Sequence, residues 1–126
     1  MNQINKAIEF AFQKHKGQFR KNSKIPYAFH PLMVANLLSL VTNDREIIIA
    51  GILHDTIEDC RVTFEEIKEK FGQGVAKYVM EVTKINGKDG IESRVGIMIK
   101  CADTLHNLSD CKDKKYIKKK LKIFKS

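Results

Sequence analysis

The sequence predicts an all-α protein: a single-domain helical bundle of about six to seven helices, with no sheet of any size. Apolar residues recur every three or four positions in one segment after another, which is the spacing of helices with one face toward a core. Good helix-capping residues, such as Asp44 and Thr63, precede some of these segments. With 126 residues, the chain is expected to form one domain over residues 1–126 with a core of normal size.

The first helix is expected over about residues 2–16, because its apolar residues fall on one face. Asn2 or Asn5 would cap its start, and Gly17 would end it. Residues 18–29 contain clustered lysine, asparagine and serine and a closing proline, so they are expected to form a loop.

A second helix is expected to begin at His30 and Pro31, since proline is tolerated in the first helical turn, and to stop near Asn43. Asp44 would cap a third helix. Its run over 47–57 is apolar on nearly every side except for one polar stripe. This helix is therefore expected to be central and buried.

Thr63 and Glu66 form a capping box at the start of the next helix, which Gly72 and Gly74 are expected to break. A valine-rich helical segment would then continue to about Thr83. Four glutamates in these segments are expected on solvated faces: Glu65, Glu66, Glu69 and Glu81. An Asn-Gly turn at 86–90 would lead into a helix over about 91–108.

The basic composition, with a net charge of +8, comes mainly from the C-terminal segment. Residues 112–126 contain eight lysines and one aspartate. The rest of the chain is nearly neutral, so no nucleic-acid partner is expected. Over about 113–125 the segment is expected to form a lysine-rich amphipathic helix that packs on the domain; binding to a membrane or an acidic partner is the alternative.

The three cysteines, Cys60, Cys101 and Cys111, are odd in number and form no C-x-x-C pair. This pattern favours a reducing compartment, so a cytoplasmic location is expected. The longest apolar run, over 47–53, is far shorter than a bilayer span, and no signal-peptide pattern opens the chain. No membrane partner is expected.

The polar stripe of the third helix lies within residues 52–59. On a continuous helix, His54 would share a face with Glu58, and Asp55 with Asp59. Three crowded carboxylates repel one another, and a partly buried charge is costly unless it is paired or coordinated. A divalent cation would remove this conflict.

One helix comfortably supplies two adjacent ligands, so the others must come from elsewhere in the chain. His30 and Asp103 are the two outside candidates. Two histidines and two aspartates suit manganese, iron, zinc or cobalt, and the residue types do not choose among these ions. His106 also lies near Asp103 on the last helix, and we favour a structural or ligand-orienting role for it over direct ligation.

The order of His30, then His54 and Asp55, then Asp103 resembles the H…HD…D signature of the HD superfamily of metal-dependent phosphohydrolases. Within it, the chain resembles the (p)ppGpp hydrolase domain of Rel/Spo enzymes and their small single-domain relatives. Six blocks in the same order carry this resemblance: KGQFRK from Lys16, PY from Pro26, HPL from His30, LHDTIED from Leu53, VTK from Val82, and AD with LHN from Ala102. The resemblance runs over about residues 4–111.

The resemblance implies an HD-type bundle and one divalent ion, most often Mn²⁺, bound by four residues: His30, His54, Asp55 and Asp103. It assigns catalysis to Glu58 and Asp59, which would activate or orient a water molecule and move its proton. From the residues alone, this pair could equally supply extra ligands. The implied nucleotide contacts are Arg20, Lys21 and Asn107, and Lys100 is grouped with them because it shares a helix face with Asp103 and Asn107.

The implied reaction removes the 3′-pyrophosphate of (p)ppGpp and releases GDP or GTP. Two departures leave alternatives open: the segment over 83–100 is shorter than in the family, and the chain ends soon after Asn107. A second copy could complete the pocket, so a homo-oligomer is one expectation. The alternatives are an HD phosphohydrolase acting on another nucleotide, such as a 3′-phosphorylated dinucleotide cofactor or a nucleoside monophosphate, and a non-catalytic nucleotide-binding regulatory module.

Overall fold

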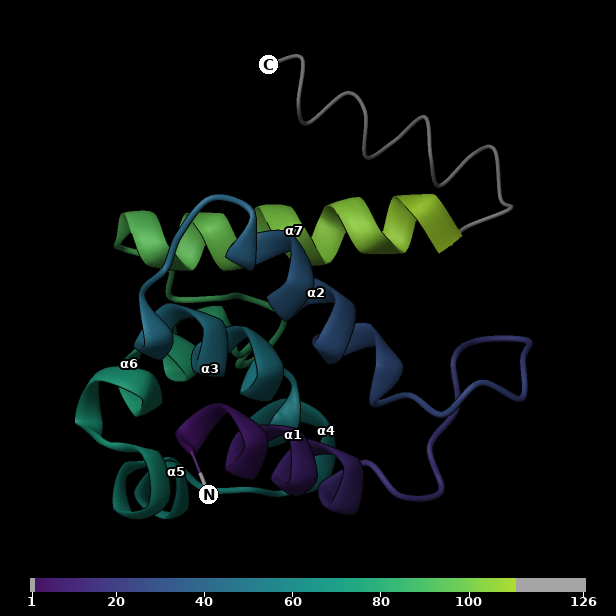
Figure 1. Cartoon of the computed structure of the whole chain (residues 1–126), viewed down its shortest axis with the longest axis horizontal. Helices are drawn as coiled ribbons and strands as arrows, with labels where there is room; N and C mark the ends of the chain where they lie inside the picture. The colour runs from purple at the N-terminus through teal and green to yellow at the C-terminus, as the bar shows by residue number, and fades with distance from the viewer. Residues whose placement is uncertain (1, 111–126) are drawn as a thin grey trace.

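A computed structural model describes residues 2–110, and this part of the chain is all-α, as predicted (Figure 1). It contains two isolated β-bridges and no strand. The seven helices are α1 (Gln3–Lys14), α2 (Phe29–Ser39), α3 (Arg45–Leu53), α4 (Thr56–Cys60), α5 (Phe64–Phe71), α6 (Gln73–Val82) and α7 (Arg94–Asp110). The lysine-rich helix expected over 113–125 lies outside the described residues.

Side-chain caps begin three of the helices where the sequence indicates. The side chain of Asn2 accepts a hydrogen bond from the backbone N–H of Asn5 at 2.8 Å, at the start of α1. Asp44 caps α3 in the same way, and Thr63 caps α5. Gly72 separates α5 from α6 with a φ of 100°, a conformation that a residue with a Cβ rarely adopts.

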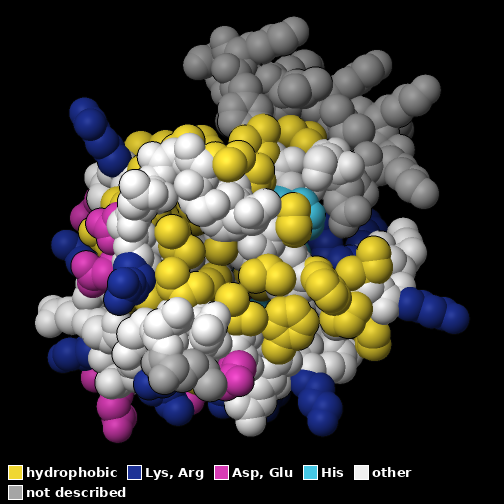
Figure 2. Space-filling view, viewed as in Figure 1, with side chains coloured by type: hydrophobic (Ala, Val, Ile, Leu, Met, Phe, Trp, Pro, Cys, Tyr) yellow, Lys and Arg dark blue, Asp and Glu magenta, His cyan; other side chains and the backbone are white. Residues whose placement is uncertain are grey.

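The core forms around α3, which packs against α1, α2, α6 and α7. Six of its nine residues are buried, so it is the central helix that its apolar run predicts. In Figure 1, α7 lies along one side of the bundle above α2, and α1, α4 and α5 lie toward the opposite side. Figure 2, in the same view, shows a broad area of apolar side chains on the face of the molecule that is turned toward the viewer. No helix within residues 2–110 has the length and hydropathy needed to span a bilayer.

The prediction of one continuous helix through residues 52–59 was wrong. α3 ends at Leu53, His54 caps it, and α4 begins at Thr56. The hydroxyl of Thr56 donates a hydrogen bond to the carbonyl of Leu53 at 2.7 Å, which takes that carbonyl away from the helical ladder. Asp55, with φ −99° and ψ −2°, occupies the break. The metal-binding candidates His54 and Asp55 are therefore on a junction between two helices.

Glu81 is not on a solvated face as expected: it is only 8% exposed. Its carboxylate accepts a hydrogen bond from the Ser93 hydroxyl at 2.7 Å, and that hydroxyl accepts one from the backbone N–H of Gly96 at 3.1 Å. Glu81 thus anchors the start of α7 on the end of α6. α2 also stops earlier than expected, at Ser39, and Gly74 lies within α6.

Candidate active site

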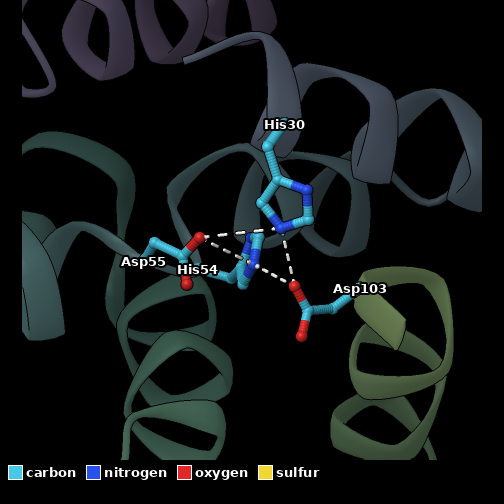
Figure 3. A group of neighbouring side chains, drawn as sticks. All are labelled: His30, His54, Asp55 and Asp103. Carbon is cyan, nitrogen blue, oxygen red and sulfur yellow. Dashed lines mark hydrogen bonds and ion pairs between the residues drawn. The ribbon is translucent and has the colours of Figure 1, made fainter. Parts of the chain in front are cut away.

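Four side chains from three parts of the fold converge on one point (Figure 3). His30 comes from the first turn of α2, His54 and Asp55 from the α3–α4 junction, and Asp103 from the middle of α7. One potential ligand atom from each residue lies within 4.8 Å of the other three. The structure therefore brings together all four residues that the sequence nominates as metal ligands.

One oxygen of each aspartate lies close to the Nε2 atoms of both histidines. Asp103 Oδ1 lies 2.7 Å from His30 Nε2 and 3.2 Å from His54 Nε2. Asp55 Oδ2 lies 3.1 Å from His54 Nε2 and 3.8 Å from His30 Nε2. Both histidines are almost fully buried, with 1% and 5% of their surface exposed. This donor set suits a divalent transition metal, because imidazole and carboxylate together bind manganese, iron, zinc or cobalt.

The remaining ring nitrogens hold the two imidazoles in place. His54 Nδ1 donates a hydrogen bond to the carbonyl of Gly51 at 2.7 Å, which leaves Nε2 facing the two carboxylates. His30 Nδ1 lies 2.7 Å from His106 Nδ1, and the two rings are stacked with centroids 5.0 Å apart. Such contacts fix the ring orientation of a metal-binding histidine. His106 thus contacts a candidate ligand, and the cluster of four does not include it.

Opposite charges within the cluster control its protonation. Burial alone would raise the pKa of Asp55, but the charge and hydrogen bond of His54 hold it at about 2. Burial alone would also raise the pKa of Asp103, but hydrogen bonds from His30 and His54 hold it well below its ordinary value. For His54, burial lowers the pKa, but Asp55 and Asp103 raise it well above its ordinary value. Two ionised carboxylates therefore surround one cationic imidazole, and a divalent ion could take the place of its proton.

Glu58 and Asp59, the candidate catalytic pair, lie on α4 and line a cavity of about 200 Å³ beside the cluster. Glu58 Oε1 accepts a hydrogen bond from the backbone N–H of Lys84 at 2.8 Å. Burial, together with the charges of Asp55 and Glu58, raises the pKa of Asp59 to about 6. A carboxylate with a pKa near neutrality is suited to accept a proton from water.

The substrate-binding candidates differ in how close they lie to this cavity. Lys100 and Asn107 line it, and Lys100 Nζ lies 3.7 Å from Asp103 Oδ2. Arg20 reaches its edge, because Nη2 donates a hydrogen bond to Asn107 Oδ1 at 3.1 Å. Lys21 is exposed on the loop before α2 and is not among the described residues that line the cavity.

A sequence model described as the HD domain matches residues 7–96, most of the chain and three of the four clustered residues. The chain belongs to the HD domain family. Asp103 lies beyond the matched residues of this HD domain, and it is the fold that places it beside His30 and His54.

The relatives of this HD domain include two proteins named guanosine-3′,5′-bis(diphosphate) 3′-pyrophosphohydrolase. One, from Aquifex aeolicus, is 54% identical over 83 residues, which is 66% of this chain and 12% of that protein. The other, MESH1 from Xenopus tropicalis, is 41% identical over 124 residues, covering 86% of this chain and 69% of that protein. The chain thus spans about two thirds of a small relative and a much smaller part of a large one.

A solved structure has the same fold as this chain. The chain matches a structure described as a metazoan ortholog of SpoT that hydrolyzes ppGpp, with a TM-score of 0.78 and 30% sequence identity. The match covers 85% of this chain and 68% of the solved chain.

The sequence assigned no role to two further residues that line the cavity, Tyr27 and Lys84. The Tyr27 hydroxyl donates a hydrogen bond to Asp55 Oδ2 at 2.6 Å. Burial and the charge of Asp55 raise the pKa of Tyr27 far above its usual range, so the hydroxyl stays protonated. Both residues fall within blocks that resemble the (p)ppGpp hydrolases. This resemblance was the one feature of the sequence that could have pointed to a role for them.

Proposed function

We propose that this HD domain is a metal-dependent phosphohydrolase that removes the 3′-pyrophosphate of (p)ppGpp and releases GDP or GTP. The buried cluster of two histidines and two aspartates beside a polar cavity carries this proposal. The names of the relatives from Aquifex aeolicus and Xenopus tropicalis support the substrate.

We assign metal binding to the cluster: His30, His54, Asp55 and Asp103. A divalent ion bound there, which we propose to be Mn²⁺, would lower the pKa of water and offset the negative charge of the phosphates. The orientation of both Nε2 atoms and the low pKa of Asp55 support this assignment, because metal ligands must be deprotonated.

The proposed reaction is hydrolysis of the bond between the ribose 3′ oxygen and the adjacent phosphorus. Water adds to that phosphorus, the bond to the 3′ oxygen breaks, and a proton is transferred to the leaving oxygen. Asp59 is placed to accept the proton of the attacking water, given its pKa of about 6. Glu58, held by the backbone N–H of Lys84, would orient the same water.

The nucleotide would be bound along α7 and the loop before α2. Lys100 and Asn107 project from α7 into the cavity, and Arg20 contacts Asn107 from the loop. Guanidinium groups grip phosphate through two parallel hydrogen bonds or stack on a base. Lys21, next to Arg20 on the same loop, would add positive charge to this side of the substrate.

We further propose a cytoplasmic location. Cys60 and Cys101 are both free thiols, which is compatible with a reducing compartment. A nucleotide is the partner that the cavity supports. Assembly with a second copy, and the absence of membrane and nucleic-acid partners, stay predictions.

The test is release of GDP and pyrophosphate from ppGpp by metal-stripped protein, with and without added Mn²⁺. Release that requires Mn²⁺ and is lost in Asp55→Ala would support the proposal. Mn²⁺ binding without turnover would contradict it. A substrate panel would then separate an HD phosphohydrolase for another nucleotide from a non-catalytic module, which would bind nucleotide saturably and release no phosphate.

A further inference from the structure

Tyr27 is held firmly at the point where the loop before α2 meets the metal-binding cluster. Its backbone N–H donates a hydrogen bond to the carbonyl of Gln18 at 2.8 Å. Within the same loop, the N–H of Arg20 donates to the carbonyl of Ile25 at 2.9 Å. These hydrogen bonds join the two ends of the loop and hold the backbone of Tyr27 in place. Tyr27 precedes His30 by three residues.

The hydroxyl of Tyr27 contacts the oxygen of Asp55 that faces the cluster. It donates a hydrogen bond to Oδ2 at 2.6 Å, and this same atom lies 3.1 Å from His54 Nε2. A hydrogen bond from a hydroxyl to a carboxylate at this distance is among the stronger ones in proteins. It therefore restrains rotation of the Asp55 carboxylate and keeps Oδ2 directed at the other candidate ligands.

Three side chains surround the ring of Tyr27. The ring centroid lies 4.9 Å from that of His15 and 5.7 Å from that of His30. The guanidinium of Arg20 lies over the ring, 5.8 Å from its centroid. Tyr27 thus contacts a candidate nucleotide-binding residue through its ring and a candidate metal ligand through its hydroxyl.

We infer that Tyr27 is a positioning residue for the metal centre: its hydroxyl fixes the Asp55 carboxylate in the orientation that binds a divalent ion. The inference rests on the proposed metal-binding function of the cluster. Loss of a hydrogen-bond partner of a metal ligand reduces metal affinity by about 10- to 100-fold. Tyr27→Phe removes the hydroxyl and keeps the ring between His15, His30 and Arg20.

The test is calorimetric titration of the metal-stripped full chain with MnCl₂, for wild type, Tyr27→Phe and Tyr78→Phe. Tyr78 is the matched control, because it is a half-buried tyrosine of α6 that packs against the core and is not among the residues that line the cavity or form the cluster. We expect the Kd for Mn²⁺ to rise at least tenfold in Tyr27→Phe and to stay at the wild-type value in Tyr78→Phe. In EDTA, Tyr27→Phe should melt at a somewhat lower temperature, because the Asp55 carboxylate loses a hydrogen bond. All three proteins should still be fully folded at the temperature of the titration, so a higher Kd reports on the metal site and not on unfolding.

A Kd in Tyr27→Phe within twofold of wild type would overturn the inference, as would a wild-type protein that binds no Mn²⁺. Hydrolysis is not needed for this titration, so a protein that binds Mn²⁺ but leaves ppGpp intact would contradict the proposed function and still decide the role of Tyr27. Where ppGpp is hydrolysed, excess Mn²⁺ should restore the activity of Tyr27→Phe and leave Asp55→Ala inactive. Failure of that rescue at full metal occupancy would also count against a role in metal binding.

Discussion

Arg20 and Asn107, separated by 87 positions in the sequence, are joined by a hydrogen bond of 3.1 Å from the guanidinium to the side-chain amide oxygen. The bond connects the loop before α2 with α7 at the edge of the cavity. Both residues are candidates for nucleotide binding. Each can exchange this contact for one with the substrate, because a guanidinium donates to phosphate or base acceptors and an amide both donates and accepts.

Arg20→Ala is expected to weaken nucleotide binding about tenfold or more, because hydrogen bonds to charged groups contribute about 1.5–3 kcal/mol. Mn²⁺ affinity should change much less, since the partners shown for Arg20 are Asn107 and the ring of Tyr27, and neither of these is a candidate metal ligand. Calorimetry with ppGpp and with MnCl₂ separates the two effects. Lys24→Ala is the control, because Lys24 is an exposed cation of the same loop. An equal loss of ppGpp affinity in the two variants would show that Arg20 contributes only positive charge and no specific contact with the nucleotide.

Asp103→Ala is expected to abolish metal-dependent stabilisation. Asp103 Oδ1 lies within 3.2 Å of both histidine Nε2 atoms, so its removal leaves the cluster without the oxygen that the two rings share. A ligand present at 100 times its Kd stabilises a protein by about 2.7 kcal/mol. Wild type and Asp89→Ala, which changes an exposed aspartate near the Asn-Gly turn, should therefore melt at a higher temperature with Mn²⁺. A similar rise in Asp103→Ala would remove this residue from the metal site.

Local rules were enough for the starts of α1, α3 and α5. Asp44 and Thr63 cap their helices as the sequence indicates, because a cap depends on residues two or three positions away. The break between α3 and α4 was missed, since apolar periodicity runs through it. In the structure, the Thr56 hydroxyl donates a hydrogen bond to the carbonyl of Leu53 at this break. The burial of Glu81 was missed for a different reason, because its partner Ser93 comes from another element.

The candidate ligands could be nominated from the sequence because the order of histidines and aspartates is distinctive. Their orienting partners could be nominated only in part: a structural or ligand-orienting role was expected for His106, but its partner His30 and any role for Tyr27 were not. Tyr27 contacts Asp55 across 28 positions, and His106 contacts His30 across 76. Neither pair shares a helix face, and an isolated tyrosine or histidine is common in a core, so only the packed structure identifies these contacts.

Glu81→Ala is expected to destabilise the protein by about 1–3 kcal/mol, the usual cost of leaving buried hydrogen-bonding groups without a partner. The change removes the acceptor of the Ser93 hydroxyl at the start of α7. Urea denaturation of the metal-free protein measures the effect. Glu69→Ala on the exposed face of α5 is the matched control and should change stability by less than about 0.5 kcal/mol. Equal stabilities would show that Glu81 does not anchor α7.

Asp59→Asn is expected to stabilise the metal-free protein at pH 7 while it abolishes hydrolysis. Burial and the neighbouring charges of Asp55 and Glu58 raise the pKa of Asp59 from 3.8 to about 6. The folded protein therefore binds a proton at this site more tightly than the unfolded chain does, and stability falls as the pH rises from about 4 to about 6. Above pH 6 the ionised carboxylate carries the whole penalty.

A shift of one pKa unit corresponds to about 1.4 kcal/mol. The Asp59 carboxylate is only partly buried and solvent screens its charge, so we expect Asp59→Asn to recover only about 1 kcal/mol. The gain should be present at pH 7 and almost absent near pH 3, where the wild-type carboxyl is protonated in both states. Urea denaturation at the two pH values, in EDTA, measures it, with Glu92→Gln as an exposed control. A gain that is the same at both pH values would show that it does not come from the charge of Asp59, and the case for this carboxylate as the proton acceptor would lose its support.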